Sequence, residues 1–292
     1  MTIEAVQPVI AVRQRSERGR LWAAFTRNRI SVAGLALALL IVAVSAGAPL
    51  IARHDPLAQE AINRLKAPGQ GYVMGRDTYG RDILARVLYA GRISLMVGIG
   101  SALLGGAIGT LMGLVAGYRG GKTENLIMRL VDILLAFPSL LMGLTVLAVL
   151  GPGLIKMIVA IGIVVSPAFA RVVHGASLAT KRLEFVEAAR AIGAGETRIM
   201  RRHILPNVMG EVVVLFSLWI ASAIRIEAGL SFIGLGVSPP TPTWGNMIRD
   251  GTQFLTNAPW LSVFPGLAIL LTVLAFNLLG DGLRDVFDPR LQ

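Results

Sequence analysis

The sequence offers few residues that could carry covalent chemistry. It contains no cysteine, and its three histidines, His54, His174 and His203, fall in separate segments, so we expect no shared metal site. Residues 120–123 (GGKT) end like a phosphate-binding loop, but Ala116 stands where the first glycine would be required. No HExxH or GxSxG pattern occurs. We therefore expect that the chain is not an enzyme and binds no cofactor or metal itself.

A charged segment between two apolar stretches is the most informative part of the chain. Residues 183–192 are rich in good helix formers, and Ala188 and Ala189 lie side by side. Small side chains there would let another protein approach the helix backbone closely. Gly193 and Gly195 should end this helix, because glycine adopts turn geometries that other residues resist.

A second helical piece can run from residue 196 to 203. We expect Pro206 to reset the chain before the next apolar run, since the residue before a proline is driven away from helical geometry. The two pieces together predict a short hook, outside the bilayer, that a separate moving protein could grip.

Charged residues inside an apolar stretch are the remaining chemical candidates. Glu211, Arg225 and Glu227 interrupt the run that begins near residue 208. We treat Arg225 and Glu227 as candidates for a transport pathway or an ion pair. The alternative is that both lie near the outer interface or pair with charges on a neighbouring helix.

The composition predicts an all-α polytopic membrane protein. Hydrophobic residues make up 54% of the 292-residue chain and charged residues 15%. A spanning helix needs about 20 apolar residues, and we expect six such spans. Their predicted limits are 30–52, 93–118, 133–150, 154–171, from about 208, and 261–280.

The basic residues predict the orientation. Six spans place both termini on one side, and the positive-inside rule makes that side the cytoplasm, because the tail and the segment around the hook are rich in arginine. The net charge of +11 is thus assigned to topology rather than to nucleic-acid binding. The predicted organisation is a cytoplasmic tail (1–29), a first span (30–52), an extracytoplasmic loop (53–92), a core with five spans (93–286) that contains the hook loop (about 172–206), and a cytoplasmic end (287–292).

Two features of the spans predict how they pack. Gly105, Gly109, Gly113 and Gly117 recur every four residues and form a stripe of small residues on one helix face, which favours close packing against a neighbouring helix over a sliding surface. Pro138 should kink the third span or leave a carbonyl free.

Several motifs together resemble one transporter family. Glu187-Ala188-Ala189, Gly193 and Ile204-Leu205-Pro206 match the EAA loop of ABC importer permeases. The chain is also similar to the C-type permease subunit of the dipeptide, oligopeptide and nickel systems over further segments, although Arg76 stands where a threonine is common. These segments are 75–82, 89–95, 227–236, 239–245, 258–260, 264–266, 275–285 and 288–290.

The resemblance implies the transmembrane domain of a type I ABC importer in a bacterial inner membrane. Its implied partners are a second homologous permease subunit, two ATPase subunits that hold ATP and Mg²⁺, and an extracytoplasmic binding protein that delivers short peptides. Glu187 would make polar contacts in an ATPase cleft, the two alanines would permit close approach, and Gly193 would form the bend. The outer segments 53–92 and 238–260 would form a docking surface, a lid, or both.

Two alternative functions remain open at this point. An importer for nickel or another small solute would share these motifs. A secondary transporter driven by an ion gradient would need a relay of buried acids, and Asp132, Glu211 and Glu227 are scattered along the chain.

Overall fold

The computed structural model describes residues 25–69 and 71–287, and in this part of the chain the only regular elements are helices. Two isolated β-bridges, Gly69–Tyr72 and Arg76–Asp82, occur outside any strand. The predicted all-α class is therefore confirmed. Most of the predicted tails, 1–29 and 287–292, lie outside the described residues.

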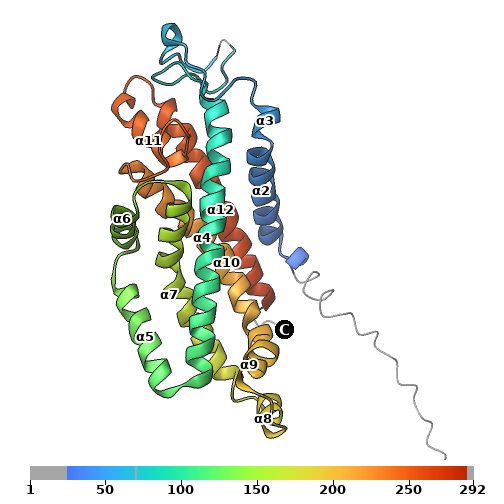
Figure 1. Cartoon of the computed structure of the whole chain (residues 1–292). Helices are drawn as coiled ribbons and strands as arrows, with labels where there is room; N and C mark the ends of the chain where they lie inside the picture. The colour runs from blue at the N-terminus through green and yellow to red at the C-terminus, as the bar shows by residue number, and fades with distance from the viewer. Residues whose placement is uncertain (1–24, 70, 288–292) are drawn as a thin grey trace, which may run out of the picture.

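The long helices run roughly side by side and are joined by shorter ones at both ends (Figure 1). In chain order the elements are α2 (Arg29–Ala46), α3 (Ala48–Ile51), η1 (Ala61–Asn63), α4 (Ile83–Arg119), α5 (Gly121–Ala136), α6 (Ser139–Leu150), α7 (Leu154–Thr180), α8 (Glu184–Ala191), α9 (Glu196–Ile199), the π-helical turn η2 (Met200–Ile204), α10 (Leu205–Phe232), α11 (Trp244–Gly251), η3 (Thr252–Phe254) and α12 (Trp260–Phe287).

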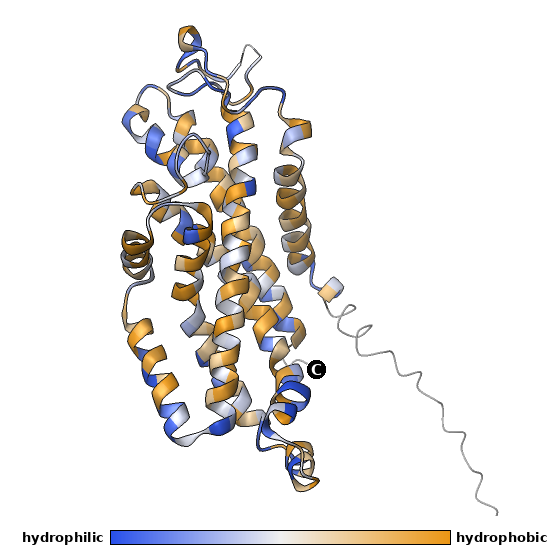
Figure 2. Cartoon of the chain, in the orientation of Figure 1, coloured by the Kyte–Doolittle hydropathy of each residue, from blue (hydrophilic) through white to orange (hydrophobic). Residues whose placement is uncertain are grey.

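Among residues 25–69 and 71–287, five helices are long and apolar enough to cross a membrane: α2, α4, α7, α12 and the continuous helix Glu196–Phe232. The pair α5 and α6 forms a sixth candidate that is bent by 99°. Hydrophobic residues run along the lengths of these helices, and hydrophilic ones gather mainly at their two ends (Figure 2). The predicted six spans are reached only when the bent pair counts as one span.

The third predicted span, 133–150, is wrong as a single helix. Phe137 adopts an extended conformation (φ −84°, ψ 135°), as the residue before a proline tends to do, and Pro138 starts α6 instead of kinking a continuous helix. The remaining 12-residue helix α6 is about 18 Å long at the usual helical rise, too short to cross a bilayer alone.

The helices also extend further than the apolar runs indicate. The outer loop ends at Asp82, ten residues earlier than predicted, because Asp82 caps α4 by accepting a hydrogen bond from the Leu84 backbone N–H at 3.2 Å. On the other side α7 continues to Thr180, so residues 172–180 are helical and the loop around the hook is shorter than 172–206.

The closest helix contact joins α4 to α7 along the glycine stripe. A Cβ atom added to Gly113 would lie 2.5 Å from the Ala170 carbonyl oxygen, and one added to Gly117 would lie 2.7 Å from the Ser177 Cβ. Gly105 and Gly109 face α7 in the same way, toward Val165 and the Ser166 carbonyl oxygen. The two backbones therefore approach each other without intervening side chains.

The two ends of the helix bundle carry different structures. Figure 1 shows α11 and the loop before α4 at one end, and α8 and α9 at the other. At the α8 end, the Asn28 side chain before α2 donates a hydrogen bond to Asp285 of α12 at 3.0 Å. The start of α2 and the end of α12 therefore lie together.

Adding one methyl group to the stripe should destabilise the protein. Gly113→Ala forces a side chain against an α7 carbonyl, and overpacking of this kind typically costs about 1–3 kcal/mol. We expect a lower melting temperature of the purified protein in detergent. Gly175→Ala on α7 is the matched control, because its Cβ would meet nothing within 4 Å. Equal melting temperatures for the two variants would contradict the packing argument.

Candidate functional site

The hook between α7 and α10 consists of α8, a turn and α9. Glu187 and Ala188 of α8 are exposed, whereas Val186 and Ala189 are buried. Gly193 has φ +81°, a left-handed conformation that side chains other than glycine rarely adopt, and it accordingly reverses the chain between the two helices. One side of α8 is thus anchored, and Glu187 and Ala188 are presented outward.

The anchored side of the hook is attached to three long helices. Val186 and Ala189 belong to a buried apolar cluster that also contains residues of α4, α7 and α10, namely Leu114, Tyr118, Val173 and Val208. The Ala194 backbone N–H donates to the Ala189 carbonyl at 3.0 Å, which closes the turn. α8 is therefore packed directly against the ends of these three helices.

Polar contacts reinforce this attachment. Arg119 at the end of α4 lies 3.3 Å from Glu196 of α9, and the Lys181 ammonium donates to the Tyr118 carbonyl oxygen. His174 of α7 lies 2.8 Å from Glu124 of α5. The turn after α4 and the start of α5 are thereby linked to the end of the bundle that carries the hook.

The expectation that Pro206 resets the chain is wrong. Residues Glu196–Phe232 form one continuous helix, within which Met200–Ile204 adopt a π-helical turn. Proline lacks the N–H that would bond to the carbonyl four residues earlier, and the π turn directly before it changes the hydrogen-bond register there. The predicted second piece, 196–203, is therefore the first part of α10's helix rather than an independent element.

The structure does not bring Arg225 and Glu227 together. Arg225 is exposed on α10 and donates a hydrogen bond to the Ser222 hydroxyl at 2.9 Å. Among the described residues no carboxylate lies within ion-pair distance of it. Glu227 is completely buried and accepts hydrogen bonds from Ser94 at 3.0 Å and Ser231 at 2.7 Å. Glu227 thus joins α10 to α4, while Arg225 faces outward.

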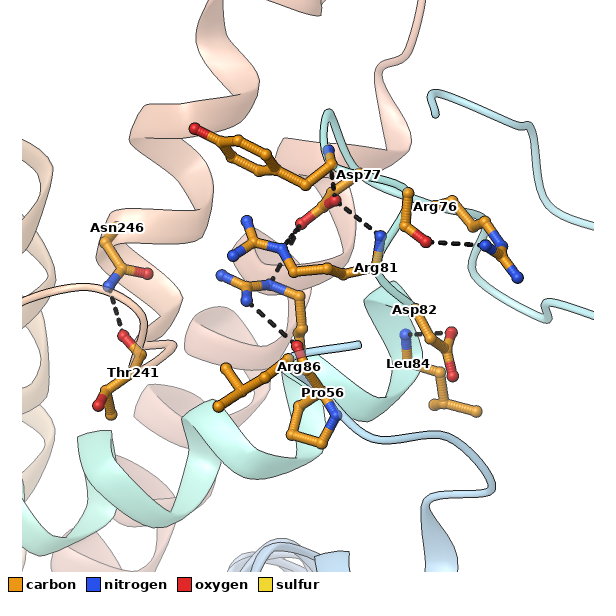
Figure 3. Close-up of polar contacts among 12 residues, drawn as sticks. Pro56, Arg76, Asp77, Arg81, Asp82, Leu84, Arg86, Thr241 and Asn246 are labelled. Carbon is orange, nitrogen blue, oxygen red and sulfur yellow. Dashed lines mark hydrogen bonds and ion pairs between the residues drawn. The ribbon is translucent and has the colours of Figure 1, made fainter. Parts of the chain in front are cut away.

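The loop between α3 and α4 contains a polar cluster that sequence reasoning did not identify. Asp77 is the central acid: its carboxylate accepts the Arg81 Nε–H at 2.6 Å and lies 3.5 Å from the Arg86 Nε (Figure 3). Its other oxygen accepts the backbone N–H groups of Tyr79 and Arg81. The repeated Arg-Asp pairs at 76–77 and 81–82 were the available signal, but they do not reveal which acid meets which base.

A neighbouring ion pair fixes the same loop. The buried Arg76 donates to Glu60 at 2.6 Å and to the Gly80 carbonyl at 2.9 Å, and it lies over the Tyr72 ring. The Arg76 guanidinium, helped by Asn63, holds the pKa of the Glu60 carboxyl below its usual value. The loop between α3 and α4 is therefore a folded structure in spite of its lack of long helices.

The titratable residues of the described chain form no metal site. His54 contacts Asp82 at 3.1 Å, His174 contacts Glu124 at 2.8 Å, and His203 lies near the Phe185 ring. Within the described ranges no three potential metal ligands of the His, Cys, Asp or Glu type come together.

Two family models match most of the chain to one group of transport proteins. Residues 109–292 match the model of the binding-protein-dependent transport system inner membrane component, and residues 16–68 match the N-terminal transmembrane domain of oligopeptide transport permease C.

Curated relatives cover almost the full length. The chain is 43% identical to a glutathione transport system permease protein of Pectobacterium atrosepticum over 99% of this chain and 96% of the relative. It is 43% identical to a di/tripeptide transport system permease protein of Pseudomonas aeruginosa, over 93% and 91% of the two chains. A dipeptide transport system permease protein of Alkalihalophilus pseudofirmus is 41% identical, over 91% and 88%.

A solved structure shows the same fold. A chain of the MetNI methionine ABC transporter in an inward-facing conformation matches with a TM-score of 0.56 and 21% identity, covering 70% of this chain and 97% of that chain.

Removing the Glu227 carboxylate should destabilise the protein. Glu227→Ala leaves the Ser94 and Ser231 hydroxyls without their acceptor in a closed site, at a cost of about 2–4 kcal/mol. Glu227→Gln keeps an acceptor oxygen and should cost less. The melting temperatures of both variants test this, with Glu211→Ala, an exposed acid on the same helix, as the control. If Glu211→Ala lowered the melting temperature as much as Glu227→Ala does, the argument would be refuted.

Proposed function

The chain belongs to the binding-protein-dependent transport system inner membrane components, and on that basis we propose that it forms half of the path by which an ATP-driven importer carries short peptides. As a member of this family it is the multi-pass inner-membrane permease of an ABC importer and not its ATPase. ATP is hydrolysed on partner subunits of such a system. The substrate, the exact set of partners and the orientation are the parts that we propose.

The exposed side of α8 is the observation that carries the coupling proposal. Glu187 and Ala188 face outward at the end of the helix bundle, and Val186 and Ala189 anchor the same helix to α4, α7 and α10. An ATPase subunit that grips the outward side would move the inner ends of these helices as it closes on ATP and Mg²⁺. In this proposal Gly193 forms the bend, and Ile204, Leu205 and Pro206 connect the hook to α10.

The proposed assembly contains a second, homologous permease subunit, two ATPase subunits and an extracytoplasmic binding protein. Large apolar side chains are exposed on α2, α5 and α6, including Leu39, Leu126 and Val149. Lipid and the second permease subunit would cover these surfaces, since apolar contact is favoured in both environments. No covalent chemistry and no bound cofactor is assigned to this chain.

Short peptides are the proposed cargo because the relatives at 41–43% identity carry names for glutathione, di/tripeptide and dipeptide transport. Glutathione is itself a tripeptide, so the three names share one chemical class. Uptake of a labelled dipeptide by the reconstituted complex tests this choice. Uptake of nickel, with no effect of competing peptides, would contradict it.

The coupling proposal predicts that bulk on the exposed side of α8 blocks transport without unfolding the protein. Ala188→Arg adds bulk to the exposed side of α8, where a lost close approach costs on the order of 1–3 kcal/mol. Gly193→Arg puts a side chain at the turn after α8, where φ is +81°. Each should reduce uptake and ATPase stimulation by about tenfold or more. Asn125→Arg, at an exposed position near the start of α5, is the control. Normal uptake by Gly193→Arg, with normal assembly, would rule out the hook as the coupling element.

The orientation proposal places both termini and α8 in the cytoplasm. It is supported by the arginines of the tail and hook, and by the Asn28–Asp285 hydrogen bond that holds the start of α2 beside the end of α12. Reporter fusions should report Arg190 inside and Asp82 outside. A cytoplasmic signal at Asp82 would overturn the predicted topology.

A further inference from the structure

Two buried arginines at the outer end have guanidinium groups whose terminal nitrogens make few hydrogen bonds within the described residues. The Arg81 guanidinium also lies over the Tyr79 ring, at 4.5 Å from its centroid. Arg81 and Arg86 are 7% and 3% exposed, and both direct Nε toward Asp77. Among the described contacts, the only hydrogen bond from their terminal nitrogens runs from Arg86 Nη1 to the Pro56 carbonyl at 3.4 Å. Figure 3 shows the two groups lying side by side, with their ends directed toward the side where Thr241 and Asn246 lie.

These nitrogens line a cavity of about 710 Å³ between the outer loop and α11. Its wall also includes Thr241, Asn246, Arg249 and Asp250. The wall is held in place by α11, which begins with a capping box: Thr243 accepts the Asn246 backbone N–H at 3.3 Å, and the Asn246 side chain accepts the Thr243 N–H at 3.0 Å. The cavity is therefore formed before any partner arrives.

The charge of the cavity selects an anion. Arg81, Arg86 and Arg249 face Asp250, with Asp77 beneath them, so guanidinium groups outnumber carboxylates by three to two. The Arg249–Asp250 pair is partly exposed and joins adjacent residues. Planar guanidinium groups with free N–H donors match the geometry of a carboxylate, which they bind through paired hydrogen bonds.

Side chains of the apolar core lie next to the cavity. A separate pocket of about 20 Å³ shares Arg81, Arg86 and Asp250 with the cavity and is also lined by Ile83, Met247 and Leu261. These three side chains belong to the buried apolar core. The site therefore suits a side chain that enters and leaves from the outer face better than a passing cargo.

We infer that this cavity receives an acidic side chain of the extracytoplasmic binding protein when that protein docks. The inference rests on the proposed importer function and assigns the docking contact to Arg81, Arg86 and Arg249. The carboxylate enters between α11 and the outer loop and accepts hydrogen bonds from the unused guanidinium nitrogens.

The test measures docking to the assembled transporter in nanodiscs with the purified, peptide-loaded binding protein of the same system as the probe. Arg249→Gln and Arg81→Lys are the variants, because Arg249 pairs only with its neighbour among the described residues, and lysine keeps the charge beside Asp77. We expect a dissociation constant about ten- to a hundredfold higher for each, the usual effect of losing hydrogen bonds to a charged group. The Arg249→Gln complex should also lose affinity less steeply as NaCl is added.

Arg64→Gln is the matched control, since it removes the same charge from an exposed position of the same loop outside the cavity. It should bind like the unsubstituted complex. Single Asp→Ala and Glu→Ala variants of the binding protein should include one that weakens binding to the unsubstituted complex but has little further effect on binding to Arg249→Gln. Such non-additive binding free energies would identify the acidic residue that contacts Arg249.

Three outcomes would overturn the inference. If Arg249→Gln and Arg81→Lys both bound the binding protein as tightly as the unsubstituted complex does, the cavity would have no part in docking. Normal docking with lost peptide uptake would assign the arginines to the cargo carboxylate instead. Failure of the unsubstituted complex to bind any binding protein would refute the proposed function itself, which separates that failure from the first two.

Discussion

The contact between the backbones of α4 and α7 is the constraint on which the rest of the architecture depends. α4 has 37 residues, about 55 Å at the helical rise, and is therefore longer than the roughly 30 Å hydrocarbon core of a bilayer. Near its start Arg86 meets Asp77, and the Val87 carbonyl accepts the Trp244 indole N–H at 3.0 Å. At its other end Arg119 meets Glu196. The single helix α4 thus connects the polar cluster around Asp77 with the hook, and the glycines of α4 allow it to pack closely against α7.

The sequence predicted features whose cause is local. Helix class follows from composition, the bend after α8 from Gly193, and the face of α4 that meets α7 from the four-residue spacing of Gly105 to Gly117. The sequence did not predict that Glu187 is exposed and Ala189 buried, because both residues belong to one short motif. The position of α4 decides which side of α8 is covered.

The features that were missed depend on contacts between distant segments or on competing local rules. The residue before Pro138 leaves helical geometry, whereas the helix passes Pro206 through a π turn, and a proline alone does not distinguish the two outcomes. The helical start at Ile83 was missed because the span was predicted from its run of apolar residues. The charged residues Arg86 and Arg92 interrupt such a run, so the first part of α4 was assigned to the loop. The pairing of Asp77 with two arginines requires a fold in which one acid is shared.

The glycine contacts also determine which changes evolution could compensate. At Gly98 the obstacle to a Cβ is the side chain of Ile224, so a second substitution to a smaller residue could restore the fit. At Gly113 the nearest atoms are the Ala170 carbonyl oxygen and the His174 nitrogen, which every amino acid carries. No replacement on α7 can make room there. Homologues should therefore vary jointly at positions 98 and 224, whereas position 113 can change only if the two helices move apart.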